Sequence, residues 1–177
     1  MKKIVLIITA IMSSINTVQG QEMKIKSMLI ASDAFADGEK IPVDYACFAC
    51  GGKNFSPPLT WEKIDTAVSY ALICEYPDAP NGPYIHWIAF NLPSTVTTLP
   101  ANANIAAIGG VQGTNTQGSA GYAGMCPPRS YHRYYFTVWA LDKKLDLSSD
   151  VTVTPFKKAL EGHVIAKGTV MGRFMCK

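Results

Sequence analysis

The sequence predicts a mainly β protein that contains few helices. Short apolar runs bounded by proline or glycine recur along the chain, and such runs are typical of buried strands. The strongest of them, residues 132–142 (HRYYFTVWALD), alternates aromatic and branched side chains over the length of a strand. A length of 177 residues, without an internal repeat or a change in composition, fits one domain.

The N-terminus has the pattern of a secretory signal peptide. Two lysines precede an apolar run over residues 4–12, and small residues occupy the −3 and −1 positions of a cleavage site after Gly20. This run is too short to span a bilayer as a helix. We therefore expect residues 1–20 to be removed and residues 21–177 to form one domain of an exported protein, either periplasmic or secreted.

The charge of the chain gives no argument for a nucleic-acid partner. The formal net charge is +3, and two of these charges lie in the predicted signal peptide, so the mature chain carries about +1. The basic residues are scattered and form no stripe. No later run reaches the roughly 18 apolar residues of a membrane helix, so we expect a soluble chain. Peripheral membrane contact is not indicated, and the oligomeric state is open, a homodimer included.

Five further segments carry the strand and helix pattern. Residues 24–35 alternate in polarity before a turn, and residues 68–76 and 85–92 are compact apolar runs. Residues 166–174 (AKGTVMGRF) form the last expected strand. The best helix signal covers residues 154–166, where the first threonine can cap the N-terminus and the following proline fits the first turn.

Two segments between these elements are harder to assign. A second short helix is predicted over residues 96–106. Residues 109–130 are rich in glycine, asparagine, threonine and serine and lack periodicity. Loops of this length inside a compact domain are usually functional or disordered. Because this one contains Tyr122 and Cys126 and ends near a double proline, we expect it to be ordered.

The cysteines indicate disulfides. Five follow the predicted signal peptide, so at least one stays unpaired in an oxidising compartment, and Cys74 in the apolar run YALICEY is the expected one. Cys47 and Cys50 form a CxxC, which is also typical of zinc and redox sites. A zinc site needs two more closely spaced ligands, and the redox motif expects a helix where this chain has glycine and proline. Disulfides to distant cysteines are therefore favoured.

Two segments have the same pattern, in which prolines are followed by a short spacer and then by a histidine at the start of an expected strand. The first, CEYPDAPNGPYIHW, contains Asp78 and His86, and the second, CPPRSYHRYYF, contains His132. We expect both histidines at the same end of adjacent strands, where with tyrosine hydroxyls they would form a small polar pocket with apolar walls. Asp78 can instead be a turn residue, and His86 a structural hydrogen-bonding group. Arg133 is expected on the opposite face, in an ion pair or at the rim.

The chain resembles the phosphatidylethanolamine-binding protein (PEBP) family, in its bacterial branch of Raf-kinase-inhibitor-like proteins. The resemblance runs from about Ser27 to Gly172 and rests on SPPLTW, PDAP, HW before a strand ending NLP, GYAGMCPP and HRYYFTVWALD. It implies a two-sheet antiparallel β-sandwich-like fold with a few short peripheral helices. It also implies an anion pocket at one end of the central sheet, which holds phosphate-bearing head groups or small oxyanions and carboxylates, without a metal or cofactor.

The resemblance implies a set of ligand-binding residues drawn from both segments: Asp78, Ala79, Pro80, His86, Pro127, Pro128, His132 and Tyr134. Where the family usually has an aspartate this chain has Tyr76, so an acceptor for a head-group ammonium is missing. Tyr76 can donate its hydroxyl to a phosphate or fill part of the cavity. The disulfides Cys50–Cys126 and Cys47–Cys176 are expected, although five thiols leave many connectivities open.

We predict a ligand-binding protein that is not an enzyme and whose affinity for anions rises as pH falls, because two imidazoles would contact the ligand. The alternative is a module that inhibits a protease or a kinase with its pocket rim, and export disfavours a cytosolic kinase. A hydrolase could use Asp78 and His86, and a metal-dependent one also His132. The chain has no G-x-S-x-G motif, however, and Ser119 and Ser130 lie in loops without that context.

Overall fold

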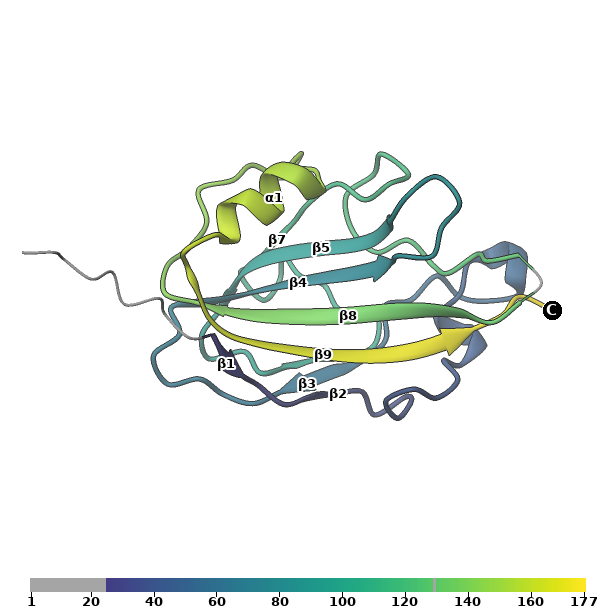
Figure 1. Cartoon of the computed structure of the whole chain (residues 1–177), viewed down its shortest axis with the longest axis horizontal. Coiled ribbons are helices and arrows are strands. Elements are labelled where there is room, and N and C mark those ends of the chain that lie inside the picture. The colour runs from purple at the N-terminus through teal and green to yellow at the C-terminus, as the bar shows by residue number, and fades with distance from the viewer. Residues whose placement is uncertain (1–24, 129) are drawn as a thin grey trace, which may run out of the picture.

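The computed structural model describes residues 25–128 and 130–177, and it contains two β-sheets and one α-helix (Figure 1). The six-stranded sheet has the order β1 (Lys26–Ser27), β9 (Val164–Phe174), β8 (His132–Leu141), β4 (Ser69–Tyr76), β5 (Tyr84–Pro93) and β7 (Val111–Gln112). The three-stranded sheet has the order β2 (Ile30–Ala31), β3 (Leu59–Trp61) and β6 (Thr98–Leu99). The predicted signal peptide and its cleavage site lie outside the described residues.

The four long strands confirm the predictions from apolar runs, since β4, β5, β8 and β9 begin and end within two residues of the expected positions. The segment over residues 24–35 is different, because it forms two short strands in different sheets. β1 pairs in parallel with β9, whereas β2 pairs antiparallel with β3. Polarity alternation indicates extended backbone but not the partner strand, so this change of sheet was not predictable.

The helix α1 (Val153–Leu160) is shorter than expected and begins earlier. Its N-cap is Thr152, so the expected cap at Thr154 is wrong. The helix ends before Gly162, which has a φ of 77° that L-residues rarely adopt, and the chain then enters β9. The helix predicted over residues 96–106 is also wrong, because that segment contains β6, which pairs with β3 and is followed by turns. Two short 3₁₀ helices, η1 (Val43–Tyr45) and η2 (Phe48–Cys50), were not predicted.

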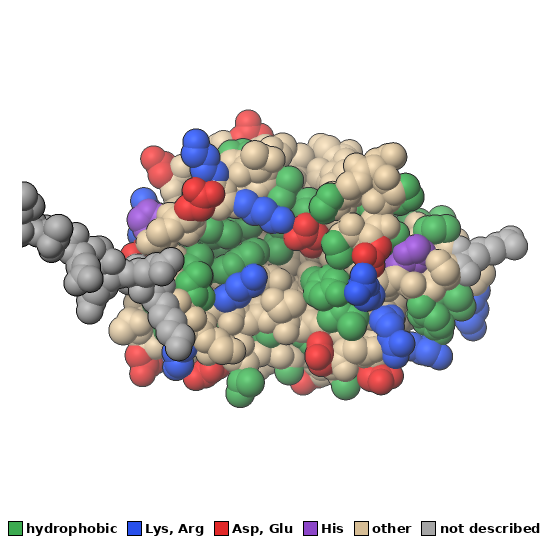
Figure 2. Space-filling view, in the orientation of Figure 1, with side chains coloured by type: hydrophobic (Ala, Val, Ile, Leu, Met, Phe, Trp, Pro, Cys, Tyr) green, Lys and Arg blue, Asp and Glu red, His purple; other side chains and the backbone are tan. Residues whose placement is uncertain are grey.

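The face of the large sheet that carries α1 has charges of both signs. Figure 2 shows acidic and basic side chains interspersed over this face, which agrees with the scattered charges of the sequence. Apolar side chains show between α1 and the neighbouring strands, where Trp139, Leu160 and Val164 help to line a groove. Within residues 25–128 and 130–177, none of the helices is long and apolar enough to cross a membrane.

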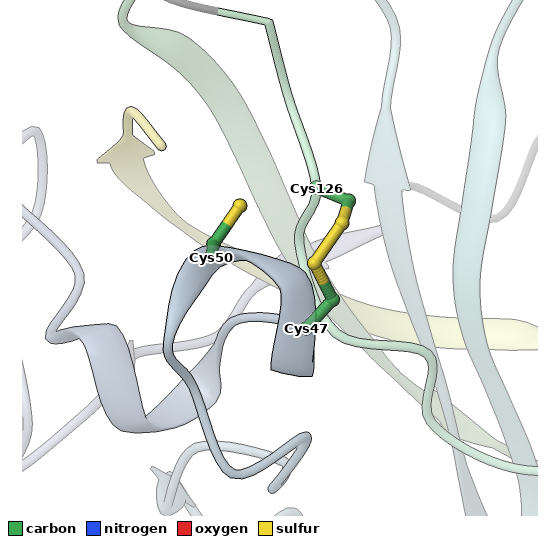
Figure 3. A group of neighbouring side chains, drawn as sticks. All are labelled: Cys47, Cys50 and Cys126. Carbon is green, nitrogen blue, oxygen red and sulfur yellow. A yellow bond between two sulfur atoms is a disulfide. The ribbon is translucent and has the colours of Figure 1, made fainter. Parts of the chain in front are cut away.

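The disulfide pairing differs from the expected one. Cys47 is bonded to Cys126, with Cα atoms 5.6 Å apart, and Cys50 to Cys176, with Cα atoms 5.2 Å apart. Cys47 N–H donates to the Met125 carbonyl at 3.0 Å, so the backbone already places Cys47 beside Cys126 (Figure 3). The expected pairs Cys50–Cys126 and Cys47–Cys176 are therefore wrong. The expectation that the CxxC bonds to distant cysteines is confirmed, as is the buried, unpaired Cys74.

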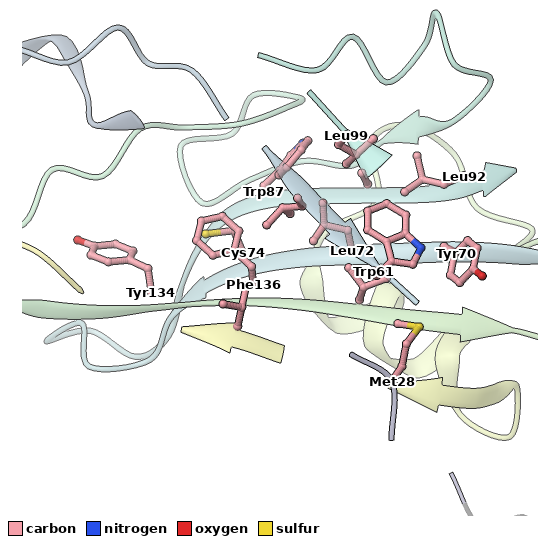
Figure 4. Packing of buried hydrophobic residues seen from close by; sticks show 14 of the residues in the cluster. Met28, Trp61, Tyr70, Leu72, Cys74, Trp87, Leu92, Leu99, Tyr134 and Phe136 are labelled. Carbon is pink, nitrogen blue, oxygen red and sulfur yellow. The ribbon is translucent and has the colours of Figure 1, made fainter. Parts of the chain in front are cut away.

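Two apolar clusters pack on the two faces of the large sheet. The larger cluster lies between the sheets and contains Trp61 and Leu99 from the small sheet and Trp87 and Phe136 from the large one. The smaller cluster lies on the other face, beneath α1. Figure 4 shows Tyr134 at one end of the labelled part of the larger cluster and away from its centre. Burial of this extent is the main source of stability for the fold.

Candidate functional site

The candidate site lies at the end of the large sheet where β4 ends and β5 and β8 begin. β4 is antiparallel to both neighbours, so β5 and β8 run in the same direction and start at this common end. The predicted common end for His86 and His132 is therefore confirmed. Their strands are not adjacent, however, because β4 lies between them. The end of β4, which contains Tyr76, therefore separates the two histidines.

A cavity of about 400 Å³ opens at this end of the sheet. Seven of the residues expected from the sequence line it, namely Tyr76, Ala79, Pro80, His86, Pro127, Pro128 and Tyr134. The others that line it are Asn81, Gly82, Pro83, Tyr84, Thr116, Gln117, Gly124 and Cys126. Among these described lining residues there is no lysine, arginine, aspartate or glutamate. The walls are therefore mostly apolar, with a few polar groups.

The loop over residues 109–130 contributes lining residues that were not predicted from the sequence. Thr116 N–H donates to the Ile85 carbonyl at 2.9 Å, and Ile85 N–H donates to Thr116 Oγ1 at 2.8 Å, so the loop is fastened to the start of β5. Asn115 holds the next turn, since its Oδ1 accepts from Gln117 N–H at 2.9 Å. Over residues 109–128, the expectation of an ordered loop is confirmed. The polar, glycine-rich composition of this loop was the only feature of the sequence that could have indicated Thr116 and Gln117 as lining residues.

Asp78 does not line the cavity, contrary to the expected set. Its carboxylate accepts two hydrogen bonds from Arg133, one from Nε at 2.9 Å and one from Nη2 at 2.7 Å. The hydrogen bond with Arg133 lowers the pKa of Asp78 below its usual value. The ion-pair role expected for Arg133 is confirmed. A planar guanidinium binds a carboxylate in this two-bond geometry better than loop N–H groups do, which explains why Asp78 turns outward.

Replacing Asp78 with asparagine is expected to leave ligand binding in the cavity almost unchanged, within about threefold of wild type. The ion pair is largely exposed and lies outside the cavity, and exposed pairs contribute little. Calorimetric titration of both proteins with inorganic phosphate measures this. A loss of tenfold or more, comparable with that of a His86 variant, would show instead that the carboxylate belongs to the site.

His86 is a buried, neutral group at the cavity wall. Its side chain is 4% exposed, and its Nδ1 lies 2.7 Å from the Ala123 carbonyl oxygen. A carbonyl can only accept, so Nδ1 carries the proton and Nε2 is left as an acceptor at the cavity. Burial lowers the pKa of His86 to about 4, although the bond to Ala123 opposes this shift. His86 is therefore uncharged at neutral pH.

Tyr134 supplies a hydrogen-bond donor, whereas His86 supplies an acceptor. Its ring is fully buried, lies 5.3 Å from the His86 ring, and lines the cavity. Its hydroxyl has no hydrogen-bond partner among the described residues. Burial raises the pKa of Tyr134, so the hydroxyl keeps its proton and remains a donor. Buried hydroxyls are nearly always paired, and an unpaired one at a cavity indicates a place for a ligand or water.

His132 is outside the cavity lining, contrary to the expected set, and belongs to a hydrogen-bonded chain behind it. Its Nδ1 lies 2.7 Å from the Tyr76 hydroxyl, and its Nε2 lies 2.7 Å from Ser130 Oγ. Both ring nitrogens are therefore occupied. The Tyr76 hydroxyl is hydrogen-bonded to His132, so Tyr76 lines the cavity with its ring, which lies 5.3 Å from the Tyr134 ring. Filling part of the cavity was one of the two roles expected for Tyr76.

The fold and the cavity define a two-sheet β protein with a candidate site for a small ligand at one end of its central sheet. A model of one family, the phosphatidylethanolamine-binding proteins, matches residues 31–175. The chain belongs to this family, which confirms the resemblance found in the motifs and the fold that it implies.

Relatives in other organisms support the assignment. A UPF0098 protein of Chlamydia pneumoniae is 43% identical over 153 residues, which are 83% of this chain and 98% of the relative. One of Methanothermobacter thermautotrophicus is 41% identical over 151 residues, with the same coverage. The crystal structure of a PEBP homologue from Chlamydia trachomatis is 39% identical, with a TM-score of 0.79, and covers 86% of this chain and 99% of its own. The structure of Escherichia coli YBCL is 32% identical, with the same TM-score, and covers 85% and 99%.

Proposed function

We propose that the chain binds small oxyanions, such as phosphate-bearing head groups or carboxylates, in this cavity and does not catalyse a reaction on them. The observation that carries the proposal is a mostly apolar cavity whose lining includes His86 and Tyr134, each with a polar atom that has no partner among the described residues. His86 Nε2 is an acceptor while the ring is neutral, and the Tyr134 hydroxyl is a donor without a partner among the described residues. The family name, which refers to a phospholipid, supports the same class of ligand.

The His86 acceptor and the Tyr134 donor favour a ligand that retains one proton. A fully ionised phosphate would meet the lone pair of Nε2 and no compensating positive charge among the described lining residues. The monoanion of a phosphate monoester retains one P–OH, because its second pKa is about 6. That hydroxyl donates to His86 Nε2, while another oxygen accepts from Tyr134. A protonated carboxylic acid offers the same pair of groups. An ionised ligand can instead accept from Tyr134 and from a His86 that has gained a proton.

The cavity also limits the size and charge of the ligand. A volume of about 400 Å³ lies at the lower end of the range for small-molecule sites, so it suits a head group or a simple acid. The lining contains no carboxylate among the described residues, since Asp78 pairs with Arg133 and the family's aspartate is replaced by Tyr76. An ethanolamine ammonium therefore has no counter-ion there. We expect phosphate monoesters without a cationic group to bind at least as well as phosphoethanolamine.

Among the residues that the structure describes, none beside His86 is an activated nucleophile. The sulfur of Cys126 is in a disulfide, and the His86 Nδ1 bonds to a backbone carbonyl and not to a carboxylate that would orient a catalytic base. These contacts favour binding without turnover. Two disulfides and a signal-peptide pattern favour a function outside the cytoplasm, in an oxidising compartment.

Calorimetric titration with inorganic phosphate and phosphoethanolamine from pH 8 to pH 5 tests the proposal. Because binding requires one proton on the ligand or on His86, the association constant is expected to rise as pH falls, by at most about tenfold per pH unit. Tyr134→Phe is expected to weaken binding about tenfold or more, since a hydrogen bond to a charged oxygen is lost. The same change should not destabilise the free protein, because the hydroxyl has no partner among the residues that the structure describes.

Tyr135→Phe is the matched control, since Tyr135 is the next residue of β8 and does not line the cavity. It is expected to bind phosphate as the wild type does. No heat of binding with either ligand at any pH would refute the proposal, and so would an affinity that rises with pH. Equal losses in the two tyrosine variants would remove Tyr134 from the site.

A further inference from the structure

Three sulfur atoms from two disulfides lie together beside the cavity. The Sγ atoms of Cys47, Cys50 and Cys126 all lie within 4.8 Å of one another (Figure 3). Cys47 is bonded to Cys126, and Cys50 is bonded to Cys176. Each disulfide therefore has a sulfur of the other one within a short side-chain movement. Disulfides exchange when a thiolate attacks one of their sulfurs, so this proximity has chemical consequences.

The three sulfurs differ in access. Cys126 is exposed and is among the residues that line the cavity, whereas Cys47 and Cys50 are half-buried. A small thiol in the cavity or in solvent therefore reaches Cys126 first. Attack at that sulfur would release Cys47 as the leaving thiolate, and Cys50 is the nearby sulfur of a second disulfide.

We propose that this cluster is a thiol–disulfide exchange site for small thiols, with Cys126 as the point of attack and Cys50 as the internal acceptor. In the first step a thiolate RS⁻ attacks Cys126 Sγ, an RS–Cys126 bond forms, and the Cys47–Cys126 bond breaks. In the second step the Cys47 thiolate attacks Cys50 Sγ, a Cys47–Cys50 bond forms, and Cys176 leaves as a thiolate. No electrons are gained or lost overall, because the chain gains one external thiol and frees one of its own.

The surroundings of the second disulfide favour this direction. Cys50 lines another cavity, of about 300 Å³, together with Lys40, Arg173 and Lys177. In the part of the chain that the structure describes, these three cations have no ion-pair partner. Positive charge beside a sulfur stabilises the thiolate, and a stabilised thiolate leaves more readily. Cys176 is next to Lys177 in the chain, so its thiolate would be released into this basic region.

The backbone permits the exchange without disturbing the sheets. Cys47 is the N-cap of the 3₁₀ helix η2 and Cys50 is its last residue, and the turn closes at Gly51 with a left-handed φ of 81°. A CxxC on such a turn can close its own disulfide, as redox CxxC motifs do. None of the four cysteines lies within a strand, so each can rotate without breaking strand pairing.

Peptide mapping after treatment with reduced glutathione tests this inference, which does not depend on anion binding. The oxidised protein is incubated with glutathione, free thiols are blocked with N-ethylmaleimide, and the chain is cut by chymotrypsin. Cleavage after aromatic residues places each of the four disulfide-bonded cysteines in its own peptide: residues 46–48, 49–55, 123–131 and 175–177. The expected products are glutathione on Cys126, a Cys47–Cys50 link and the maleimide on Cys176.

Two variants complete the test. Cys50→Ser/Cys176→Ser removes the acceptor disulfide, and glutathione is then expected on Cys126 with the maleimide on Cys47. Cys74→Ser is expected to give the wild-type products, because that thiol is buried and outside the cluster. Circular dichroism before blocking confirms that the fold is retained. Any other wild-type pattern from folded protein overturns the inference, including no adduct, or an adduct on Cys50 or Cys176 with Cys47–Cys126 intact.

Discussion

Acidification from pH 7 to pH 4 is expected to lower the free energy of unfolding by about 3 kcal/mol through His86 alone. The pKa of His86 is about 4 in the folded protein because the ring is buried, compared with about 6.5 in an unfolded chain. Between these values the unfolded state binds a proton at this residue that the folded state does not. The stabilising effect of the neutral ring is therefore complete above pH 6.5 and is lost as pH falls towards 4.

The measurement is urea unfolding of the wild type and of His86→Asn at several pH values. Asparagine places its amide nitrogen where His86 Nδ1 lies, so it can still donate to the Ala123 carbonyl, but it does not titrate. The variant is expected to be less stable at pH 7 and to lose about 3 kcal/mol less than the wild type on acidification.

The exposed acidic groups contribute equally to both proteins, so only the difference between the two curves reports on His86. His163→Asn controls for the loss of an imidazole, since His163 lies at the far end of β8, beside Asp142, and outside the cavity. Because His86 is intact in this variant, its loss of stability on acidification is expected to exceed that of His86→Asn. If the wild type and His86→Asn lose stability in parallel, the folded His86 is not held in its neutral form.

Removal of either disulfide is expected to cost about 2–5 kcal/mol of stability. Cys47–Cys126 joins residues 79 positions apart, and Cys50–Cys176 joins residues 126 positions apart. Cross-links between such distant positions restrict the unfolded chain strongly, and their removal restores that freedom. This loss is a large part of the 5–15 kcal/mol that stabilises a typical domain.

Denaturant unfolding of Cys47→Ala/Cys126→Ala and of Cys50→Ala/Cys176→Ala measures the two contributions separately. The wild type treated with dithiothreitol should be less stable than either double variant, because both cross-links are then absent. Cys74→Ala is the control for loss of a thiol, since Cys74 forms no disulfide, and reductant should lower its stability as much as that of the wild type. A loss below about 1 kcal/mol in both double variants would contradict the expected role of the disulfides.

The long strands were predictable because their evidence is local. β4, β5 and β8 are apolar or aromatic runs that end at proline, glycine or charged residues, and such runs bury themselves in almost any sheet. The segment over residues 96–106 was misread because its threonine and alanine content allows a helix. In the structure β6 is only two residues long and exists because β3 lies beside it.

The candidate site was predictable in its location and only partly in its composition. The repeated order of prolines and a histidine placed His86 correctly at the common end of β5 and β8. It also grouped Asp78 and His132 with the cavity, although Arg133 binds the first and Tyr76 and Ser130 bind the second. A motif indicates which residues lie near a site. The hydrogen-bond partners available in the folded protein determine which of their side chains line it.

Patterns along the chain were enough to predict the family, the mainly β fold, the long strands and the end of the sheet at which the cavity lies. The disulfide pairing, the neutral state of His86 and the Tyr134 hydroxyl, which has no partner among the described residues, depend on the folded arrangement. The reason is physical. Burial, and the distances between groups far apart in the chain, set protonation, hydrogen bonding and sulfur chemistry, and neither exists until the chain has folded.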